Sequence, residues 1–248
     1  MDLIHRKTYP VHYYEVDFRG LALPQSLLNY LQDAAGEHAS ALGFSVLDLL
    51  KKGMTWLLSR YHVRILRPPR VGDSVILSTW PSGTQGLFAL RDFAAEDQRG
   101  RPLFEATSSW VLWNLAARQP ARLEESLPGR LAHDRRAVDD PFLPLPALTR
   151  TDHELDFRVW MQDIDFNNHV NHAAYVLWAL ETPPEDVLRA CAPSEIEIAY
   201  KAEAFYGDEI ISRLQTGGSA AEPAFLHGLF HKGNGTELAR LRTAWSPV

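Results

Sequence analysis

The stretch Trp160–Pro183 reads WMQDIDFNNHVNHAAYVLWALETP, a polar first half followed by an apolar second half. Asparagine and aspartate before an apolar run predict a helix N-terminus, because their side-chain oxygens accept hydrogen bonds from backbone N–H groups that lack partners inside the helix. The helix dipole favours developing negative charge at that end. We therefore predict a polar loop over 163–168 that leads into a largely buried helix. The polar residues of the stretch are Asp163, Asp165, Asn167, Asn168, His169, Asn171 and His172.

This polar cluster has other interpretations. Asp165 and Asn167 are also ordinary turn and capping residues. A calcium-binding loop would need glycine at its sixth position and glutamate at its twelfth, where this chain has asparagine and alanine, so we exclude it. His169 and His172 are candidate metal ligands, but no HExxH motif or cysteine pair accompanies them, and we expect no metal.

Length and composition narrow the function classes. The 248 residues suit one large domain or two smaller ones, and the 46% of hydrophobic residues suffice for sizeable cores. A net charge of -6 argues against nucleic-acid binding by overall charge. Cys191 is the only cysteine, so an internal disulfide is excluded and a reducing compartment is expected. The N-terminus has no apolar signal core and no apolar run reaches about 18 residues, so we expect a cytoplasmic protein without membrane spans.

The first part of the chain is predicted to contain a strand, a long helix, a short helix and then antiparallel strands. Leucines and alanines recur at helical spacing after Pro24, and Gly43 ends that pattern. Alternating β-branched and aromatic residues predict the strands. The predicted elements are a strand over 8–16, helices from Pro24 to about Leu42 and over 45–52, and strands over 56–65, 75–80, 88–95 and 107–113.

The order of elements then repeats after a region of different composition. Prolines stand among arginines and aspartates without periodicity between about 116 and 150, which predicts a linker. We place the domains at 1–118 and 151–248 and the linker at 119–150. The second domain is predicted to contain a strand over 153–160, the helix from Asn171, and strands over 195–200, 209–215, 225–231 and 237–245.

A direct alignment supports this internal repeat. Residues 15–19 align with 163–167 and, without a gap, the following helices align as well; further on, 71–76 align with 206–211. In this register the first copy has arginine and leucine where the second has the asparagine and histidine of the polar loop. Two units of similar scaffold are therefore predicted, and only the second carries the polar cluster.

Three motifs in the chain occur together. The polar stretch is followed by Tyr175, Trp178 and Glu181, while the first unit contains Arg91-Asp92-Phe93 and then Ala106–Asn114, with Arg118 and a proline soon after. Over about residues 5–245 this set resembles the acyl-acyl carrier protein (acyl-ACP) thioesterases of plants and bacteria. The resemblance implies an α+β double hot-dog fold, in which two tandem units each wrap a curved antiparallel sheet around a long helix.

The resemblance also implies the site. Asp165, Asn167 and His169 match the family's catalytic loop, and the segment 199–204 makes Glu203 the fourth catalytic residue. By its own context Glu203 is a surface carboxylate at a strand end, so only the resemblance makes it a candidate. Plant members often have cysteine after this glutamate. Alanine in that place leaves no candidate for a cysteine nucleophile.

These residue types suit hydrolysis of a thioester by water. Glu203 is the expected general base, and Asn167 is expected to position the water. His169 and the N–H groups at the helix start are expected to stabilise the oxyanion. Asp165 either orients His169, polarises the carbonyl or is itself the base, and the sequence leaves these roles open. No metal or organic cofactor is expected, because a thiolate leaves easily.

The family implies an apolar tunnel in the first unit and an acidic carrier protein that docks on basic residues. Each candidate tunnel residue is also ordinary core, and each candidate arginine is also an ordinary solvated side chain. The candidate tunnel residues are Leu27, Leu31, Met54, Trp56 and Leu58. The candidate carrier-binding residues are Arg60, Arg64, Arg67 and Arg70, with Arg130, Arg135 and Arg136 in the linker.

Alternatives of other classes stay open. An acyl-CoA hydrolase would use the same site, and a hot-dog protein that binds acyl chains without cleaving them would not need the polar cluster. A hot-dog dehydratase would pair His169 with an acidic helix residue such as Glu181. The sequence does not fix the chain length of the acyl group or whether the protein is a monomer or a homodimer.

Overall fold

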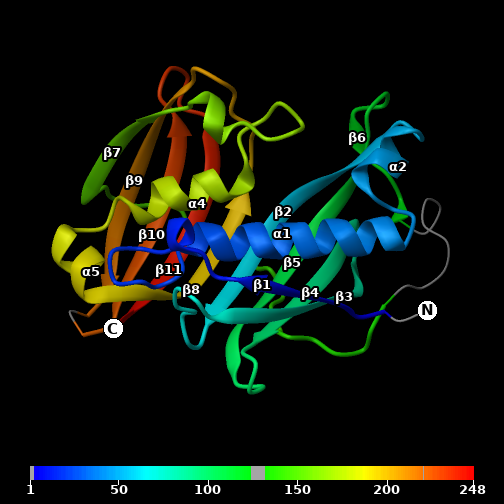
Figure 1. The fold of residues 1–248 in the computed structure, drawn as a ribbon. Helices are drawn as coiled ribbons and strands as arrows, with labels where there is room; N and C mark the ends of the chain where they lie inside the picture. The colour runs from blue at the N-terminus through cyan, green and yellow to red at the C-terminus, as the bar shows by residue number, and fades with distance from the viewer. Residues whose placement is uncertain (1–2, 124–131, 220) are drawn as a thin grey trace. The chain divides into compact units, whose positions relative to one another are not determined.

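The computed structural model of the chain describes residues 3–123, 132–219 and 221–248. The chain divides into two units, Met1–Pro141 and Phe142–Val248. Each unit places its longest helix against an antiparallel sheet, as the α+β double hot-dog prediction required (Figure 1). None of the described helices is long and apolar enough to cross a membrane.

In the N-terminal unit the strands follow the order β1-β3-β4-β5-β2, and every neighbouring pair is antiparallel. The short β6 pairs with the end of β5. The elements are β1 (His5–Pro10), the 3-10 helix η1 (Tyr13–Glu15), α1 (Pro24–Ala41), α2 (Val46–Leu50), β2 (Met54–Ile65), β3 (Ser74–Gln85), β4 (Phe88–Glu96), β5 (Pro102–Asn114) and β6 (Gln119–Pro120).

The sequence explains why α1 forms where it does. Pro24 stands at the first helical position, where its missing N–H costs nothing. Leu27, Leu31 and Ala34 recur on one face and are almost completely buried. Gly43 follows the helix with φ 78°, a left-handed conformation that glycine adopts without strain. The predicted span of this helix is confirmed.

The Arg91-Asp92-Phe93 motif alternates between the two faces of β4. Arg91 lies on the face toward α1, where its Nη1 is 3.1 Å from His38 Nδ1. Burial lowers the pKa of Arg91 to about 10. Asp92 points to the opposite face and Phe93 returns to the fully buried core beside Tyr61. Residues of this motif therefore contribute to the packing and polar contacts of this sheet.

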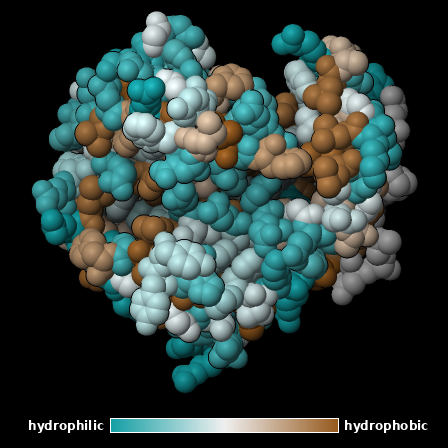
Figure 2. Space-filling view, turned by 45° about the horizontal axis from the view of Figure 1, so that its top comes forward, coloured by the Kyte–Doolittle hydropathy of each residue, from teal (hydrophilic) through white to brown (hydrophobic). Residues whose placement is uncertain are grey.

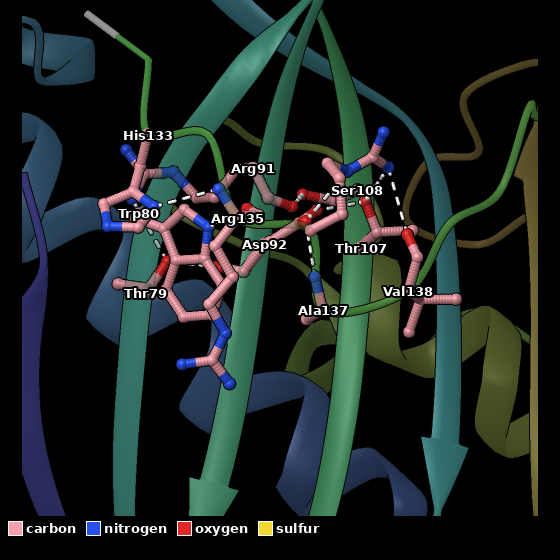
Figure 3. A network of polar contacts seen from close by, with 11 residues as sticks. Thr79, Trp80, Arg91, Asp92, Thr107, Ser108, His133, Arg135, Ala137 and Val138 are labelled. Carbon is pink, nitrogen blue, oxygen red and sulfur yellow. Dashed lines mark hydrogen bonds and ion pairs between the residues drawn. The ribbon is translucent and has the colours of Figure 1, made fainter.

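Part of the predicted linker is packed structure. Asp92 is fully buried and accepts hydrogen bonds from Thr107 Oγ1, from Arg136 Nε at 2.9 Å and from the Ala137 N–H at 2.8 Å (Figure 3). The chain over 132–141 thus lies on the outer face of this sheet and belongs to the N-terminal unit. A buried carboxylate is stable only with such partners, so the segment and the sheet depend on each other.

In the C-terminal unit the order is β8-β11-β10-β9-β7, again antiparallel throughout. Helix α4 packs against β9 and β10. The elements are β7 (His153–Arg158), the 3-10 helix η2 (Met161–Asp163), α4 (His172–Leu180), α5 (Glu185–Ala190), β8 (Cys191–Tyr200), β9 (Glu209–Gly218), β10 (Pro223–His231) and β11 (Glu237–Pro247).

Some local predictions were wrong. The strands predicted over 8–16 and 153–160 end early, at Pro10 and Arg158, and 3-10 turns follow. In each turn an acidic side chain accepts the N–H three residues before it, which closes the chain into a turn. Helix α5 was missed, because the two prolines before it were interpreted only as the end of α4 and not as the start of a helix.

The internal repeat is confirmed in the backbone. Isolated bridges join Val16 to Ala22 in the first unit and Ile164 to Val170 in the second, in the register of the sequence alignment. A left-handed residue lies inside each of these loops, Gly20 in the first and Asn168 in the second. The two units therefore share one loop design before their long helices.

The buried His227 predicts how stability depends on pH. It lies on β10 with its Nε2 2.9 Å from Thr243 Oγ1, and burial lowers its pKa to about 3. Between about pH 6.5 and pH 3, His227 binds a proton in the unfolded chain but not in the folded protein. The free energy of unfolding is therefore expected to fall by up to about 1.4 kcal/mol per pH unit as the pH drops from 6.5 toward 3.

Urea unfolding of the wild type and of His227→Gln between pH 7 and pH 4 measures this contribution. The variant is expected to lose stability less steeply with acid than the wild type. His153→Gln, at an exposed position, is the control and should keep the wild-type slope. Equal slopes for His227→Gln and the wild type would contradict the assignment.

Candidate active site

The polar loop is organised by the Asp165 carboxylate. Its Oδ1 accepts the N–H of Asn167 at 2.8 Å and that of His169 at 3.3 Å. The Asp165 N–H in turn donates to the His169 carbonyl at 2.7 Å. Asn168, with φ 64°, takes the left-handed conformation that asparagine tolerates better than most residues. These bonds present Asn167 and His169 from one closed loop.

The start of α4 is capped from within. The Asn171 side chain accepts the N–H of Ala173 at 2.9 Å, and its carbonyl accepts that of Ala174 at 2.9 Å. The Asn171 N–H donates to the Asp163 carbonyl at 2.7 Å. The cap that the sequence predicted is present, but it already uses these N–H groups. They are therefore weaker candidates for oxyanion stabilisation than the side chains of the loop.

His169 meets Glu203 across the two segments. His169 Nδ1 lies 3.3 Å from Glu203 Oε1, and both side chains are partly exposed, at 37% and 51%. The Val170 N–H donates to the Ala204 carbonyl at 3.0 Å, which fixes the two segments side by side. The ring of Phe205 meets the imidazole edge to face at 5.3 Å. This arrangement gives a histidine and a carboxylate in contact at the surface.

The structure thus brings together the four residues that the resemblance implied. Asn167 Nδ2 lies 3.5 Å from Asp165 Oδ2, at the limit of a hydrogen bond. Glu203, rather than Asp165, contacts the His169 ring, whereas Asp165 bonds to backbone groups of its own loop. The carboxylate partner of the imidazole is therefore the residue that sequence context alone would have passed over.

Sequence reasoning missed the apolar residues around this site. Phe166 is 81% exposed beside the polar loop, and Phe205 follows the Glu203 segment. Their neighbours in sequence include further exposed apolar residues. In the sequence, an exposed aromatic side chain cannot be told from an ordinary loop residue, because only the fold shows which segments lie together. The sequence therefore gave no signal for these apolar residues. Exposed apolar residues that adjoin the two segments in sequence include Trp160, Met161 and Tyr206.

The predicted tunnel residues lie in two settings. Leu27 and Leu31 are buried on the inner face of α1. Met54 and Trp56 are partly buried against the cluster of Leu49, Leu112 and Leu123, and Leu58 follows them on β2. Figure 2 shows hydrophobic residues (brown) gathered at the right of the view, over the part of the molecule where Figure 1 labels α2 and β6.

The predicted carrier-binding arginines differ in what they contact. Arg64 and Arg70 are exposed and Arg60 is half-buried. Arg67 donates to Asp97 at 2.9 Å, and Asp97 also pairs with Arg101, so Arg67 is already engaged in a shared ion pair.

The linker arginines also fall into separate groups. Arg135 stacks its guanidinium over the Trp80 ring at 5.1 Å, and the Trp80 Nε1 donates to the Arg135 carbonyl at 2.7 Å (Figure 3). Arg136 is engaged by the buried Asp92 and has a structural role. Arg130 lies outside the described residues.

Comparison with known proteins gives matches along nearly the whole chain. The family model described as the acyl-ACP thioesterase N-terminal domain matches residues 2–129, and that of the C-terminal domain matches residues 147–247. The chloroplastic dodecanoyl-[acyl-carrier-protein] hydrolase of Umbellularia californica is 30% identical over 266 residues, which cover 99% of this chain and 68% of that protein. The chloroplastic oleoyl-acyl carrier protein thioesterase of Coriandrum sativum is 27% identical, covering 98% and 77%.

Solved structures agree with this match. The 12:0-ACP thioesterase from Umbellularia californica superposes with a TM-score of 0.89 at 29% identity, covering 99% of this chain and 95% of that one. An acyl-ACP thioesterase from Bacteroides thetaiotaomicron superposes with a TM-score of 0.85 at 25% identity, covering 98% of each chain.

The loop geometry predicts how Asn168 responds to substitution. Asn168→Ala should lower the free energy of unfolding by about 1–2 kcal/mol, because alanine is strained at positive φ, whereas Asn168→Gly should be close to neutral. Gly20→Ala, at the equivalent place in the first unit with φ 76°, is the matched control and should cost a similar amount. Urea denaturation measures all three, and a neutral Asn168→Ala would refute the loop geometry.

Proposed function

Because the chain belongs to the acyl-ACP thioesterase family, we propose that it hydrolyses acyl groups carried on acyl carrier protein, releasing a free fatty acid and the carrier thiol. The observation that carries the proposal is the contact between His169 and Glu203 beside the Asp165 loop. The chain is an enzyme of the thioester hydrolase class.

In the proposed reaction the His169–Glu203 pair is the general base. The carboxylate accepts a hydrogen bond from the Nδ1–H group and so fixes the imidazole in one tautomer. The other ring nitrogen, Nε2, then takes a proton from the attacking water. This assigns the base to a pair, whereas the sequence suggested Glu203 and left Asp165 open as the base. The 3.3 Å contact supports the change, because it places the carboxylate beside Nδ1 of the imidazole ring.

Water oxygen then bonds to the thioester carbonyl carbon, and the carbonyl oxygen gains negative charge. The Asn167 amide, exposed on the loop and only weakly engaged with Asp165, is the proposed donor to that oxygen. The carbonyl double bond re-forms as the carbon–sulfur bond breaks, and the leaving thiolate takes up the proton that the His169–Glu203 pair removed from the water. Asp165 has a positioning role, because its oxygens hold the backbone of Asn167 and His169.

The same proposal assigns binding sites to the acyl chain and to the carrier protein. We place the acyl chain in the first domain, near Trp56 and the Leu112 cluster, and catalysis in the second. The exposed Arg64 and Arg70 are the proposed contacts for the acidic carrier, whereas Arg67 is already paired with an aspartate. A cytoplasmic location is part of this proposal, because a single cysteine is typical of a reducing compartment. Monomer and homodimer both agree with it.

An acyl-CoA thioesterase is the second candidate, because the same four residues would cleave either thioester. A carrier protein offers a folded acidic surface, whereas CoA offers a nucleotide and phosphates. Rates measured with one acyl chain on both carriers therefore separate the two functions. Substitution of Arg64 and Arg70 by alanine is expected to raise KM for acyl-ACP and leave kcat unchanged.

Glu203→Gln tests the proposed base. The variant keeps the shape of the side chain but removes its charge, so kcat/KM for acyl-ACP is expected to fall by about 10²–10⁴-fold. Glu222→Gln, an exposed glutamate in the same unit, is the matched control and should behave as the wild type. Release of the carrier thiol measures the rate, and a fully active Glu203→Gln would remove Glu203 from the mechanism.

Because of the internal repeat, Asp17 in the first unit is a matched control for Asp165. Asp17 accepts the N–H groups of Arg19 and Leu21 in the first unit as Asp165 does those of Asn167 and His169. Either aspartate-to-alanine variant should lose about 1 kcal/mol of unfolding free energy. Only Asp165→Ala should also lose about 100-fold in kcat/KM, because only its loop carries catalytic groups. Equal activity of both variants would contradict the assignment of the site to the second unit.

A further inference from the structure

Tyr175 bonds to the backbone on both sides of Glu203. It lies on α4 and is 4% exposed. Its hydroxyl oxygen accepts the N–H of Ala204 at 3.0 Å and lies 3.5 Å from the carbonyl oxygen of Ala202. Burial raises the pKa of Tyr175 above its ordinary value, so the hydroxyl keeps its proton for the carbonyl. One side chain thus spans the three-residue segment that presents the carboxylate.

The other bonds of this segment are built from backbone groups. The N–H groups of Lys201 and Ala202 both donate to the Leu238 carbonyl, at 2.9 and 3.2 Å. The Ala204 carbonyl accepts the Val170 N–H at 3.0 Å. Ala204 is fully buried, so without the tyrosine hydroxyl its N–H would face a desolvated environment.

The first unit repeats these backbone bonds. Leu66 and Arg67 both donate to the Leu103 carbonyl at 2.9 Å, and Ala22 donates to the Pro69 carbonyl at 2.8 Å. These are the bonds of Lys201, Ala202 and Val170 in the register of the repeat.

The first unit cannot form the contact that Tyr175 makes, because it has different residues at the equivalent positions. The places of Glu203 and Ala204 are held there by Pro68 and Pro69, and the place of Tyr175 by Leu27. Proline has no N–H to donate and leucine has no hydroxyl to accept it. The shared scaffold therefore forms without this contact. The hydroxyl and the N–H that it binds occur together only in the unit that carries the catalytic glutamate.

We propose that Tyr175 is a positioning residue, whose hydroxyl holds the Glu203 segment in the place that keeps the carboxylate against His169. This inference rests on the proposed function of that pair. Tyr175 acts through Glu203 and takes no part in the chemistry itself. A displacement of about 1 Å in such a group costs up to about 100-fold in rate, so loss of the hydroxyl should be visible in turnover.

A double-mutant cycle of Tyr175→Phe and Glu203→Gln tests the proposal. Tyr175→Phe removes one oxygen and should lower kcat for acyl-ACP by about 10-fold or more, with little change in KM. In the Glu203→Gln background the same change should have no further effect, because the carboxylate to be positioned is gone. Structural damage alone would lower activity by the same factor in both backgrounds.

The control for a lost buried hydroxyl is Tyr30→Phe. Tyr30 is buried on α1 and its hydroxyl donates to Glu15 Oε2 at 2.7 Å, far in sequence from the site. This variant should lose stability and keep kcat. Ala204→Pro removes the N–H from the other side of the contact and copies the residue of the first unit. It should lower kcat as Tyr175→Phe does and not add to it.

The outcomes separate the two proposals. If the wild type is active, Glu203→Gln is inactive and Tyr175→Phe is fully active, the positioning role is overturned and the proposed function is left intact. A loss that multiplies in the Glu203→Gln background also overturns it. A wild type without thioesterase activity, or a fully active Glu203→Gln, overturns the proposed function itself. If Tyr175→Phe fails to fold, Ala204→Pro takes its place in the same cycle, with the same expected and contradicting results.

Discussion

The hydrogen bond from the Val170 N–H to the Ala204 carbonyl holds the site together. It joins a loop before α4 to a segment after β8, and the residues just before each bonded group are His169 and Glu203. Without this backbone pairing the imidazole and the carboxylate would belong to separate surface segments. The same bond joins Ala22 to Pro69 in the first unit, so it is part of the scaffold and forms independently of the chemistry.

A few differences on a repeated framework therefore separate the unit that carries the proposed catalytic residues from the unit that lacks them. Both loops are closed by an aspartate that accepts two backbone N–H groups, and both contain one left-handed residue. The second copy has the proposed catalytic residues Asn167, His169 and Glu203, where the first has arginine, leucine and proline. The scaffold supplies rigidity, and the added residues supply a proton acceptor and hydrogen-bond donors.

Much of this was predictable from local patterns. The spacing of apolar residues predicted α1 and α4, and the alignment of the two copies predicted the shared loops. Glu203 required the family resemblance, because a glutamate after a strand carries no mark of its partner. The proposed positioning role of Tyr175 and the structural role of Arg136 were not predictable, because a tyrosine in an apolar helix is typical of the core and an arginine in a proline-rich segment is typical of a solvated side chain. Their roles depend on long-range contacts that local sequence does not encode.

The most direct test of the proposed base is thiol release from acyl-ACP and acyl-CoA substrates of C8 to C18, with the wild type, His169→Gln, Glu203→Gln and the double variant. We predict release from acyl-ACP that is faster than from acyl-CoA and a large loss in each single variant. The double variant should be no worse than the poorer single one, because the two residues act as one base. Release from neither substrate, together with tight binding of acyl chains, would contradict this mechanism.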